Sequence, residues 1–229
     1  MHIVLDIETE PFTKRFRKAV SVAERRRLAP KPRLACAYIV EKKKYQFFSD
    51  TAVRDVIPIL EAATEVVTYN GEQFDFLVLE RYCGLKRNAA FRARCVDMYE
   101  VLTQLDSRFR ISLDRASKPN FCVGKKVKGK ILGVAEIDTL TKGCRSDVKQ
   151  THMLYCLWRE GQLLFPVRPE KGLPACCPEC GRKIELVPFQ PDYTDMTEGQ
   201  IFDYELGHSF GVWGYVRCIK CKKFNVWGI

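Results

Sequence analysis

The chain has 229 residues and is 46% hydrophobic, which fits one large domain, or one of about 150–170 residues with a small appendage, and excludes a low-complexity chain. It contains no run of about 18 apolar residues and no signal-peptide start, so the sequence excludes a transmembrane helix, and the expected location is cytoplasmic. Residues 171–229 hold seven basic and seven acidic residues and are neutral. The net charge of +10 therefore belongs wholly to residues 1–170, which hold 31 basic and 21 acidic residues. Such a basic domain attracts polyanions, nucleic acid first.

Hydrophobic periodicity predicts strands near the N-terminus and alternating helices and strands after them. Residues 2–8 are predicted as the first strand, and residues 34–40 and 44–49 as a hairpin pair. The further predicted elements are a helix over 51–62, a strand over 65–69, and helices over 73–84, 98–106 and about 145–160. This order predicts an α/β sandwich around a mixed sheet.

An insertion over residues 10–33 separates the first two strands and holds the densest charge cluster of the chain. Nine basic residues stand there against Glu10 and Glu24. Because the insertion directly follows the first strand, we predict that it contacts phosphates, with Arg15 as a candidate residue. A solvated helix face, or a charge that serves solubility alone, is the alternative.

Acidic residues stand at the ends of three predicted elements. Asp6 and Glu8 lie two positions apart on the first strand, so their side chains point the same way. Two carboxylates so placed repel each other unless a cation lies between them, and Mg²⁺ or Mn²⁺ prefers oxygen ligands. Asp75 and Asp147 each lie near the start of a predicted helix, where an acid also complements the helix dipole.

These three segments, in this order, resemble the motifs of the DEDD (DnaQ-like) 3′–5′ exonucleases. The matching segments are Leu5-Asp6-Ile7-Glu8-Thr9, Tyr69-Asn70-Gly71 with Phe74-Asp75, and Cys144 to Thr151 followed by Leu154-Tyr155. The segment Ser112-Leu113-Asp114-Arg115-Ala116 also resembles one that often precedes the third motif. The resemblance covers residues 1 to about 165, and it implies a ribonuclease-H-like fold, with a mixed five-stranded sheet flanked by helices.

The resemblance also implies a mechanism and a set of site residues. Asp6, Glu8, Asp75 and Asp147 would be the catalytic acids and would hold two Mg²⁺ or Mn²⁺ ions about 3.5–4 Å apart. One ion would activate a water for attack, and the other would stabilise the leaving 3′ oxygen. Thr9, Phe12 and Asn70 would line the 3′-terminal nucleotide, although Phe12 also fits a core aromatic and Asn70 also fits the turn that Asn-Gly favours.

One part of the family pattern is missing. Members carry a Tyr four residues before the last acid, or a His five before it, to orient or deprotonate the water. Here those positions are Gly143 and Lys142, as if the helix that carries this residue had been trimmed. Lys142 is a candidate to hold the water or a phosphate, and His152, five residues after Asp147, should point well away on a continuous helix.

Two C-x-x-C pairs near the C-terminus predict a structural Zn²⁺ site. The ligands would be Cys177, Cys180, Cys218 and Cys221, a spacing typical of a zinc ribbon. Residues 166–175 hold three prolines and a glycine and are predicted as a linker. The predicted organisation is therefore a ribonuclease-H-like domain over 1–165 and a zinc ribbon over 176–229, which is a candidate surface for a protein partner.

The sequence thus predicts a metal-dependent 3′–5′ exonuclease that acts on single-stranded DNA or on RNA. A catalytically weak nucleic-acid-binding or partner-docking module that keeps the metal site is one alternative. A structure-specific endonuclease on the same fold is another.

Overall fold

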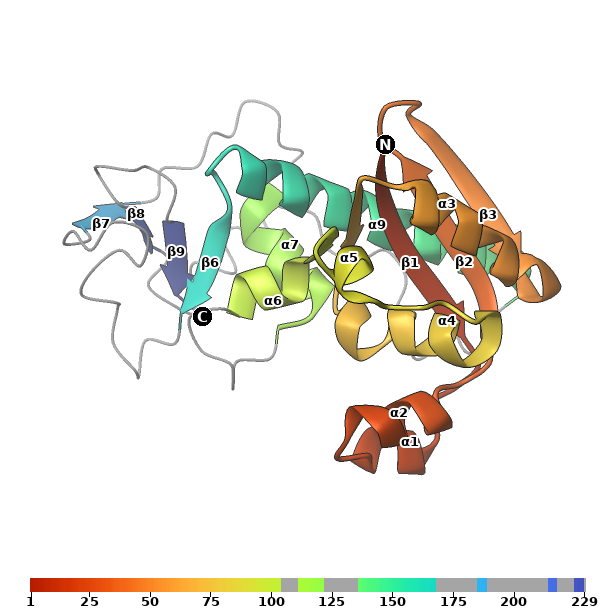
Figure 1. Ribbon diagram of the computed structural model, residues 1–229. Helices are drawn as coiled ribbons and strands as arrows, with labels where there is room; N and C mark the ends of the chain where they lie inside the picture. Colours follow the sequence, from red (N-terminus) through yellow and green to blue (C-terminus); the bar gives the residue numbers. More distant parts are fainter. Residues whose placement is uncertain (104–110, 122–135, 168–184, 189–213, 218–224, 229) are drawn as a thin grey trace. The chain divides into compact units, whose positions relative to one another are not determined.

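The computed structural model describes residues 1–103, 111–121, 136–167, 185–188, 214–217 and 225–228 (Figure 1). The described residues form two compact units. One lies within Met1–Val101 and Lys125–Met153, and the other within Leu102–Gly124 and Leu154–Ile229. No helix among the described residues is long and apolar enough to cross a membrane. The two C-x-x-C pairs predicted to bind zinc lie outside the described residues.

A mixed five-stranded sheet forms the first unit, as predicted. Its strand order is β3-β2-β1-β4-β5, in which β1 pairs antiparallel with β2 and parallel with β4. The strands are β1 (His2–Thr9), β2 (Pro32–Ile39), β3 (Lys44–Ser49), β4 (Glu65–Thr68) and β5 (Cys95–Asp97). The three-residue β5 is too short to show the alternation by which the others were predicted.

Alternation along β1 divides its side chains between the two faces of the sheet. Ile3, Leu5 and Ile7 belong to a buried core that includes residues of the 3-10 helix η1 (Asp50–Asp55) and of α3 (Val56–Ala62) and α4 (Asp75–Cys83). Asp6 and Glu8 face the other way, toward α9 (Ile137–Arg159). In Figure 1, α9 passes behind β1 and β2, whereas α3 and α4 lie in front of the sheet.

The helices differ from the predicted ranges in three places. The helix predicted over 51–62 divides into η1 and α3, and the one predicted from residue 73 begins at Asp75, after the 3-10 turn η2 (Gly71–Gln73). The last helix begins at Ile137 rather than near 145. Lys142 and Gly143 therefore lie inside a continuous helix, and the expectation of a trimmed helix was wrong.

The insertion forms two short helices, α1 (Lys14–Lys18) and α2 (Val22–Leu28), which Figure 1 shows projecting from the sheet below α4. A hydroxyl caps each helix. Thr13 Oγ1 accepts a hydrogen bond from the backbone N–H of Phe16, and Ser21 Oγ accepts one from Glu24, each at 3.1 Å. Between β4 and β5 lies the short helix α5 (Ala89–Arg92), and α6 (Met98–Thr103) follows β5.

The second unit contains a four-stranded sheet of order β6-β9-β8-β7. Its elements are α7 (Leu113–Phe121), β6 (Leu164–Val167), β7 (Glu185–Pro188), β8 (Gly214–Arg217) and β9 (Asn225–Gly228). The β7–β8 and β8–β9 pairs are antiparallel, and β6 pairs parallel with β9. Strand β6 ends at Val167, and residues 168–175 of the predicted linker lie outside the described residues.

Candidate metal centre

Two acids of β1 and a thiol of α9 form a compact cluster. One carboxylate oxygen each from Asp6 and Glu8 and the Sγ of Cys144 all lie within 4.8 Å of one another. The acids are half-buried and the thiol is completely buried. Cys144 Sγ also donates a hydrogen bond of 3.4 Å to the backbone carbonyl of Asp6, which shows how closely α9 approaches the strand. Asp6 and Glu8 were predicted to point the same way, whereas Cys144 was not predicted as a potential ligand.

Asp75 is a buried carboxylate close to this cluster. Its side chain is only 3% exposed, and its Oδ1 has no hydrogen-bond partner among the described residues. Burial raises the pKa of Asp75 well above the ordinary value of 3.8, and the carboxylates of Asp6 and Asp97 raise it further. A divalent cation would satisfy the unpartnered oxygen and offset the repulsion between these acids, so the donor set fits such an ion.

Asp147 lies on α9 one turn after Cys144, on the same side of the helix. It is 5% exposed, which is unusual for an acid and is typical of one that is paired or holds a metal. Within the described residues, the 4.8 Å group comprises Asp6, Glu8 and Cys144, and leaves out Asp75 and Asp147. The acids from β1, α4 and α9 thus belong to one unit, and the tightest grouping is at the strand.

Asp97, at the end of β5, is a buried acid that was not predicted from the sequence as a functional residue. It accepts hydrogen bonds from the backbone N–H groups of Asn70 (2.6 Å), Glu72 (3.1 Å) and Tyr99 (2.9 Å). Burial raises the pKa of Asp97, and these three donors act in the opposite direction. The side chain thereby holds the turn that leads into Asp75. The parallel pairing of β5 with β4, which places Asp97 beside Thr68, could have revealed this role.

The turn itself depends on a close approach between Gly71 and Thr68. Asn70 adopts the left-handed conformation, with a φ of 64°, and the 3-10 turn η2 begins at the next residue. A Cβ built on Gly71 would lie 2.6 Å from the Cβ of Thr68, a residue that is completely buried. Only glycine therefore fits at this position without moving the turn.

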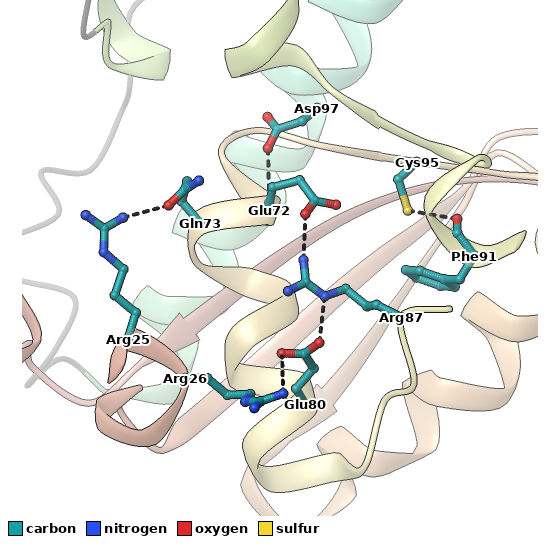
Figure 2. Close-up of polar contacts among 9 residues, drawn as sticks. All are labelled: Arg25, Arg26, Glu72, Gln73, Glu80, Arg87, Phe91, Cys95 and Asp97. Atoms are coloured by element: carbon teal, nitrogen blue, oxygen red, sulfur yellow. Dashed lines mark hydrogen bonds and ion pairs between the residues drawn. The ribbon is translucent and has the colours of Figure 1, made fainter. Parts of the chain in front are cut away.

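Ion pairs connect the turn to α4 and to the insertion (Figure 2). Arg87, only 3% exposed, contacts Glu72 Oε2 at 2.6 Å and Glu80 Oε1 at 2.8 Å. Glu80 Oε2 also lies 3.8 Å from Arg26 of α2, and Arg25 donates a hydrogen bond of 2.7 Å to Gln73 Oε1. Arg25 and Arg26 of the insertion thus connect α2 to the turn and to α4, although the Arg26 side chain remains 54% exposed.

The other cations of the insertion are exposed, except for the half-buried Arg33. Five of them have no ion-pair partner among the described residues, namely Lys14, Arg15, Arg17, Lys18 and Arg27. Four of these belong to α1, a helix without a single buried residue. The predicted phosphate contact Arg15 therefore lies on a basic, solvent-facing helix.

An aromatic trio links α1 to the residue before Asp75. Phe12, 42% exposed, stacks on Phe16 with ring centroids 5.4 Å apart and an interplanar angle of 11°. Both rings also meet Phe74 edge-on, with centroids 5.1 Å and 6.2 Å from it. The sequence left open whether Phe12 is a core aromatic or a stacking platform, and its exposure is compatible with stacking on a base.

Thr9 and Lys142, which were also predicted to contact the substrate, differ in how exposed they are. Thr9 is 7% exposed, and its hydroxyl donates a hydrogen bond of 2.9 Å to the carbonyl of Glu10, so it is engaged with the backbone. Lys142 is exposed on α9. His152 packs edge-on against Tyr38 at 5.1 Å, and burial lowers its pKa. In the described part of the chain, no histidine joins the cluster of Asp6, Glu8 and Cys144.

Comparison with known proteins agrees with the fold. A family model of the RNase_H superfamily matches residues 3–119, a range that holds Asp6, Glu8, Asp75 and Asp97. No curated protein matches the chain. Among solved structures, the chain is similar to the family B DNA polymerase from the hyperthermophilic archaeon Pyrobaculum calidifontis, at 16% identity and a TM-score of 0.52. The match covers 70% of this chain but only 24% of the polymerase, so the likeness concerns the fold.

Proposed function

Because the chain belongs to the RNase_H superfamily, we propose that it is a metal-dependent nuclease that shortens nucleic acid from the 3′ end. The observation that carries this proposal is the grouping of carboxylates from β1 and α4. Asp6 and Glu8 share one face of the strand, and the buried Oδ1 of Asp75, which has no hydrogen-bond partner among the described residues, lies close to them. An arrangement of this kind is destabilised by its own repulsion unless it binds cations.

In the proposed site, Asp6, Glu8, Asp75 and Asp147 hold two Mg²⁺ or Mn²⁺ ions. When bound, such ions supply an activated water and stabilise the charge on the phosphate and the leaving oxygen. The contribution of the protein is positional. The pairing of β1 with β2 and β4 fixes Asp6 and Glu8, while Asp97 fixes the turn before Asp75.

The substrate surface in this proposal is α1 together with the aromatic trio. The exposed cations Arg15, Arg17 and Lys18 contact backbone phosphates, and Phe12 stacks on an unpaired base. Asn70 and Thr9 border the terminal nucleotide through the turn and the strand end on which they lie. Stacking on an exposed ring requires an unstacked base, so the proposal favours single-stranded DNA, with RNA as the other candidate.

A second candidate function follows from Lys142 and Gly143. Neither is a conventional base, and loss of a general base costs about 10²–10⁴-fold in rate. A nucleic-acid-binding module that keeps its metal ions but cleaves slowly or not at all is therefore the alternative. Lys142, exposed on α9, is proposed to contact a phosphate in either case.

For the C-terminal segment we propose one structural Zn²⁺ bound by Cys177, Cys180, Cys218 and Cys221. Four thiolates in two C-x-x-C pairs suit tetrahedral zinc, and a segment this small gains much of its folding free energy from the metal. A protein partner docking on this ribbon is part of the same proposal.

The test uses one single-stranded oligonucleotide labelled at either end, with Mn²⁺ present. Stepwise shortening of the 5′-labelled strand, with immediate release of a labelled mononucleotide from the 3′-labelled strand, is expected. Asp6→Ala should abolish both signals, whereas Glu61→Gln, an exposed acid of α3, should retain them. Internal cuts would identify an endonuclease instead. Tight binding without cleavage under all conditions would overturn the nuclease proposal and favour the binding module.

A further inference from the structure

We propose that Cys144 is a ligand of the cation held by Asp6 and Glu8, and that its thiolate gives this centre a preference for softer divalent ions. The inference rests on the proposed metal site and concerns which metal that site selects. It assigns a role to a side chain that the proposed nuclease mechanism does not use.

The geometry brings the sulfur within reach of a shared ion. Cys144 Sγ and one oxygen each of Asp6 and Glu8 lie within 4.8 Å of one another. Metal–oxygen and metal–sulfur bonds of about 2.0–2.3 Å allow two ligands of one ion to lie up to about 4.5 Å apart. Small side-chain movements would therefore let all three atoms meet a single cation.

A separate observation points to a cation at the same place. The Oδ1 of Asp75 is buried and has no hydrogen-bond partner among the described residues, and burial first, then the neighbouring carboxylate of Asp6, raise the Asp75 pKa. A buried acceptor of this kind is costly unless something positive faces it. An acid next to Asp6 thus offers a buried oxygen that a cation at this centre would satisfy.

The hydrogen bond between the Cys144 thiol and the backbone of Asp6 is weak enough for a metal ion to replace it. Its bond to the carbonyl of Asp6 is long, at 3.4 Å, and a thiol is a weak donor. The sulfur is completely buried, which shields it from reagents in solution.

A sulfur ligand changes the selectivity of the centre. Mg²⁺ requires a near-octahedral set of oxygens, whereas thiolates favour Zn²⁺, Co²⁺ and Cd²⁺. With Cys144 present, the centre should bind Cd²⁺ much more tightly than an all-carboxylate site would. Mn²⁺, which relies on the carboxylates, should depend little on the sulfur.

The experiment measures binding of two metals by the full chain. Cd²⁺ binding is followed by its thiolate charge-transfer absorbance and by competition with a chelator, and Mn²⁺ binding by the electron paramagnetic resonance of the free ion. Cys144→Ala should remove the absorbance of one cysteine and weaken Cd²⁺ binding about tenfold or more, while Mn²⁺ affinity changes less than about threefold. Cys144→Ser, which nearly preserves the volume, serves if the alanine variant unfolds.

Two control variants identify the sulfur concerned. Cys156→Ala, a half-buried cysteine three turns further along α9, should leave both metals unaffected. Cys36 is buried and pairs across the sheet with Asp6, so it is the competing thiol. Loss of the signal in Cys36→Ala but not in Cys144→Ala would overturn the assignment.

The outcome for wild type separates the inference from the proposed function. If wild type binds Mn²⁺ but Cys144→Ala binds Cd²⁺ as tightly as wild type does, the thiol is no ligand and only the inference fails. If wild type binds no Mn²⁺ at all, the carboxylate site of the proposed nuclease fails. A Cd²⁺ signal that still depends on Cys144 would then uphold the sulfur ligand alone.

Discussion

The carboxylate of Asp97 accepts a hydrogen bond of 2.6 Å from the backbone N–H of Asn70. The same carboxylate also receives the N–H groups of Glu72 and Tyr99, so one side chain terminates β5 and fixes the turn after β4. Asp75 begins its helix three residues after Glu72. Asp97 is therefore a positioning residue for a proposed metal ligand.

Asp97→Asn should weaken the turn and, through it, metal binding. The amide offers one acceptor oxygen in place of two and turns its NH₂ group toward a backbone donor, which should cost about 1–3 kcal/mol of unfolding free energy. Thermal unfolding and Mn²⁺ affinity should both fall. The exposed acid Asp55, changed to Asn, is the matched control. Unchanged Mn²⁺ affinity in a destabilised Asp97→Asn protein would limit this residue to a structural role.

Asp75 should make the metal-free protein less stable as the pH rises. Its pKa in the folded protein is raised above the ordinary value of 3.8, so the folded state holds a proton that the unfolded chain has already lost. Stability should therefore fall as the pH rises from about 4 toward the folded pKa. In the presence of a chelator at pH 7, Asp75→Asn should unfold at a higher temperature than wild type.

That difference should disappear below about pH 4, where the carboxyl is protonated in both states. It should reverse when Mn²⁺ is added, because only wild type keeps the full set of ligands. Scanning calorimetry of both proteins at pH 3.5 and 7, with and without metal, checks all three statements. An Asp75→Asn variant that is less stable than wild type in chelator at pH 7 would contradict the raised pKa.

The cations of α1 should determine how binding depends on salt. Replacing Arg15, Arg17 and Lys18 with Ala should reduce the slope of log affinity against log salt by about 2 for single-stranded DNA. Lys42→Ala with Lys43→Ala, in the exposed turn between β2 and β3, should leave the slope unchanged. Fluorescence anisotropy at four salt concentrations measures both. Equal slopes in all three proteins would remove α1 from the substrate surface.

Phe12→Ala should weaken binding to a single strand by about 1–3 kcal/mol, whatever the sequence of bases. Phe12→Tyr keeps the ring and should bind normally. Because Phe12 also packs on Phe16 and Phe74, unfolding has to be measured alongside. If Phe12→Ala lowers the stability of the protein but not its affinity for a single strand, the role of Phe12 is structural.

Restoring a base on α9 should increase turnover. Lys142 is exposed and lies five residues before Asp147, where some of the exonucleases that the sequence resembles carry a His. Lys142→His should therefore raise the cleavage rate about 10- to 100-fold. The gain should follow the ionisation of the new imidazole, appearing as the pH rises through about 6.5. Lys149→His, also exposed on α9, should give no gain. A rate that stays at the wild-type level would indicate that position 142 does not reach the reacting water.

The sequence predicted the sheet well where the residues alternate over several positions. For β1, the alternation of apolar and acidic residues indicated both the strand and the face shared by Asp6 and Glu8. The sequence did not predict β5, because a strand of three residues is too short to show alternation of apolar and polar side chains. Asp97, the last residue of β5, was therefore missed as well. The start of α9 was also missed, because Lys142 and Gly143 resemble a loop, although the helix continues through both.

The candidate site was predicted only as far as residue type indicates chemistry. Acids indicate a site for hard cations, so the sequence predicted the four acids as ligands, and of these Asp6 and Glu8 lie in the compact cluster. Cys144 was interpreted as part of a motif, and its nearness to Asp6 depends on the packing of α9 against β1, which a single sequence does not reveal. The hydrogen bond of Arg25 to Gln73 and the ion pair of Arg26 with Glu80 depend in the same way on where α2 packs.

The close approach of Gly71 to Thr68 limits which substitutions position 71 can accept, as well as how the turn folds. Glycine brings no chemistry to the site, yet every other side chain would place a Cβ 2.6 Å from the Cβ of a buried threonine. In a saturation library selected for function, codon 71 should therefore tolerate replacement as poorly as codons 6 and 8. Such a library would mark the turn as part of the functional site, although none of its own atoms is proposed to touch a metal ion.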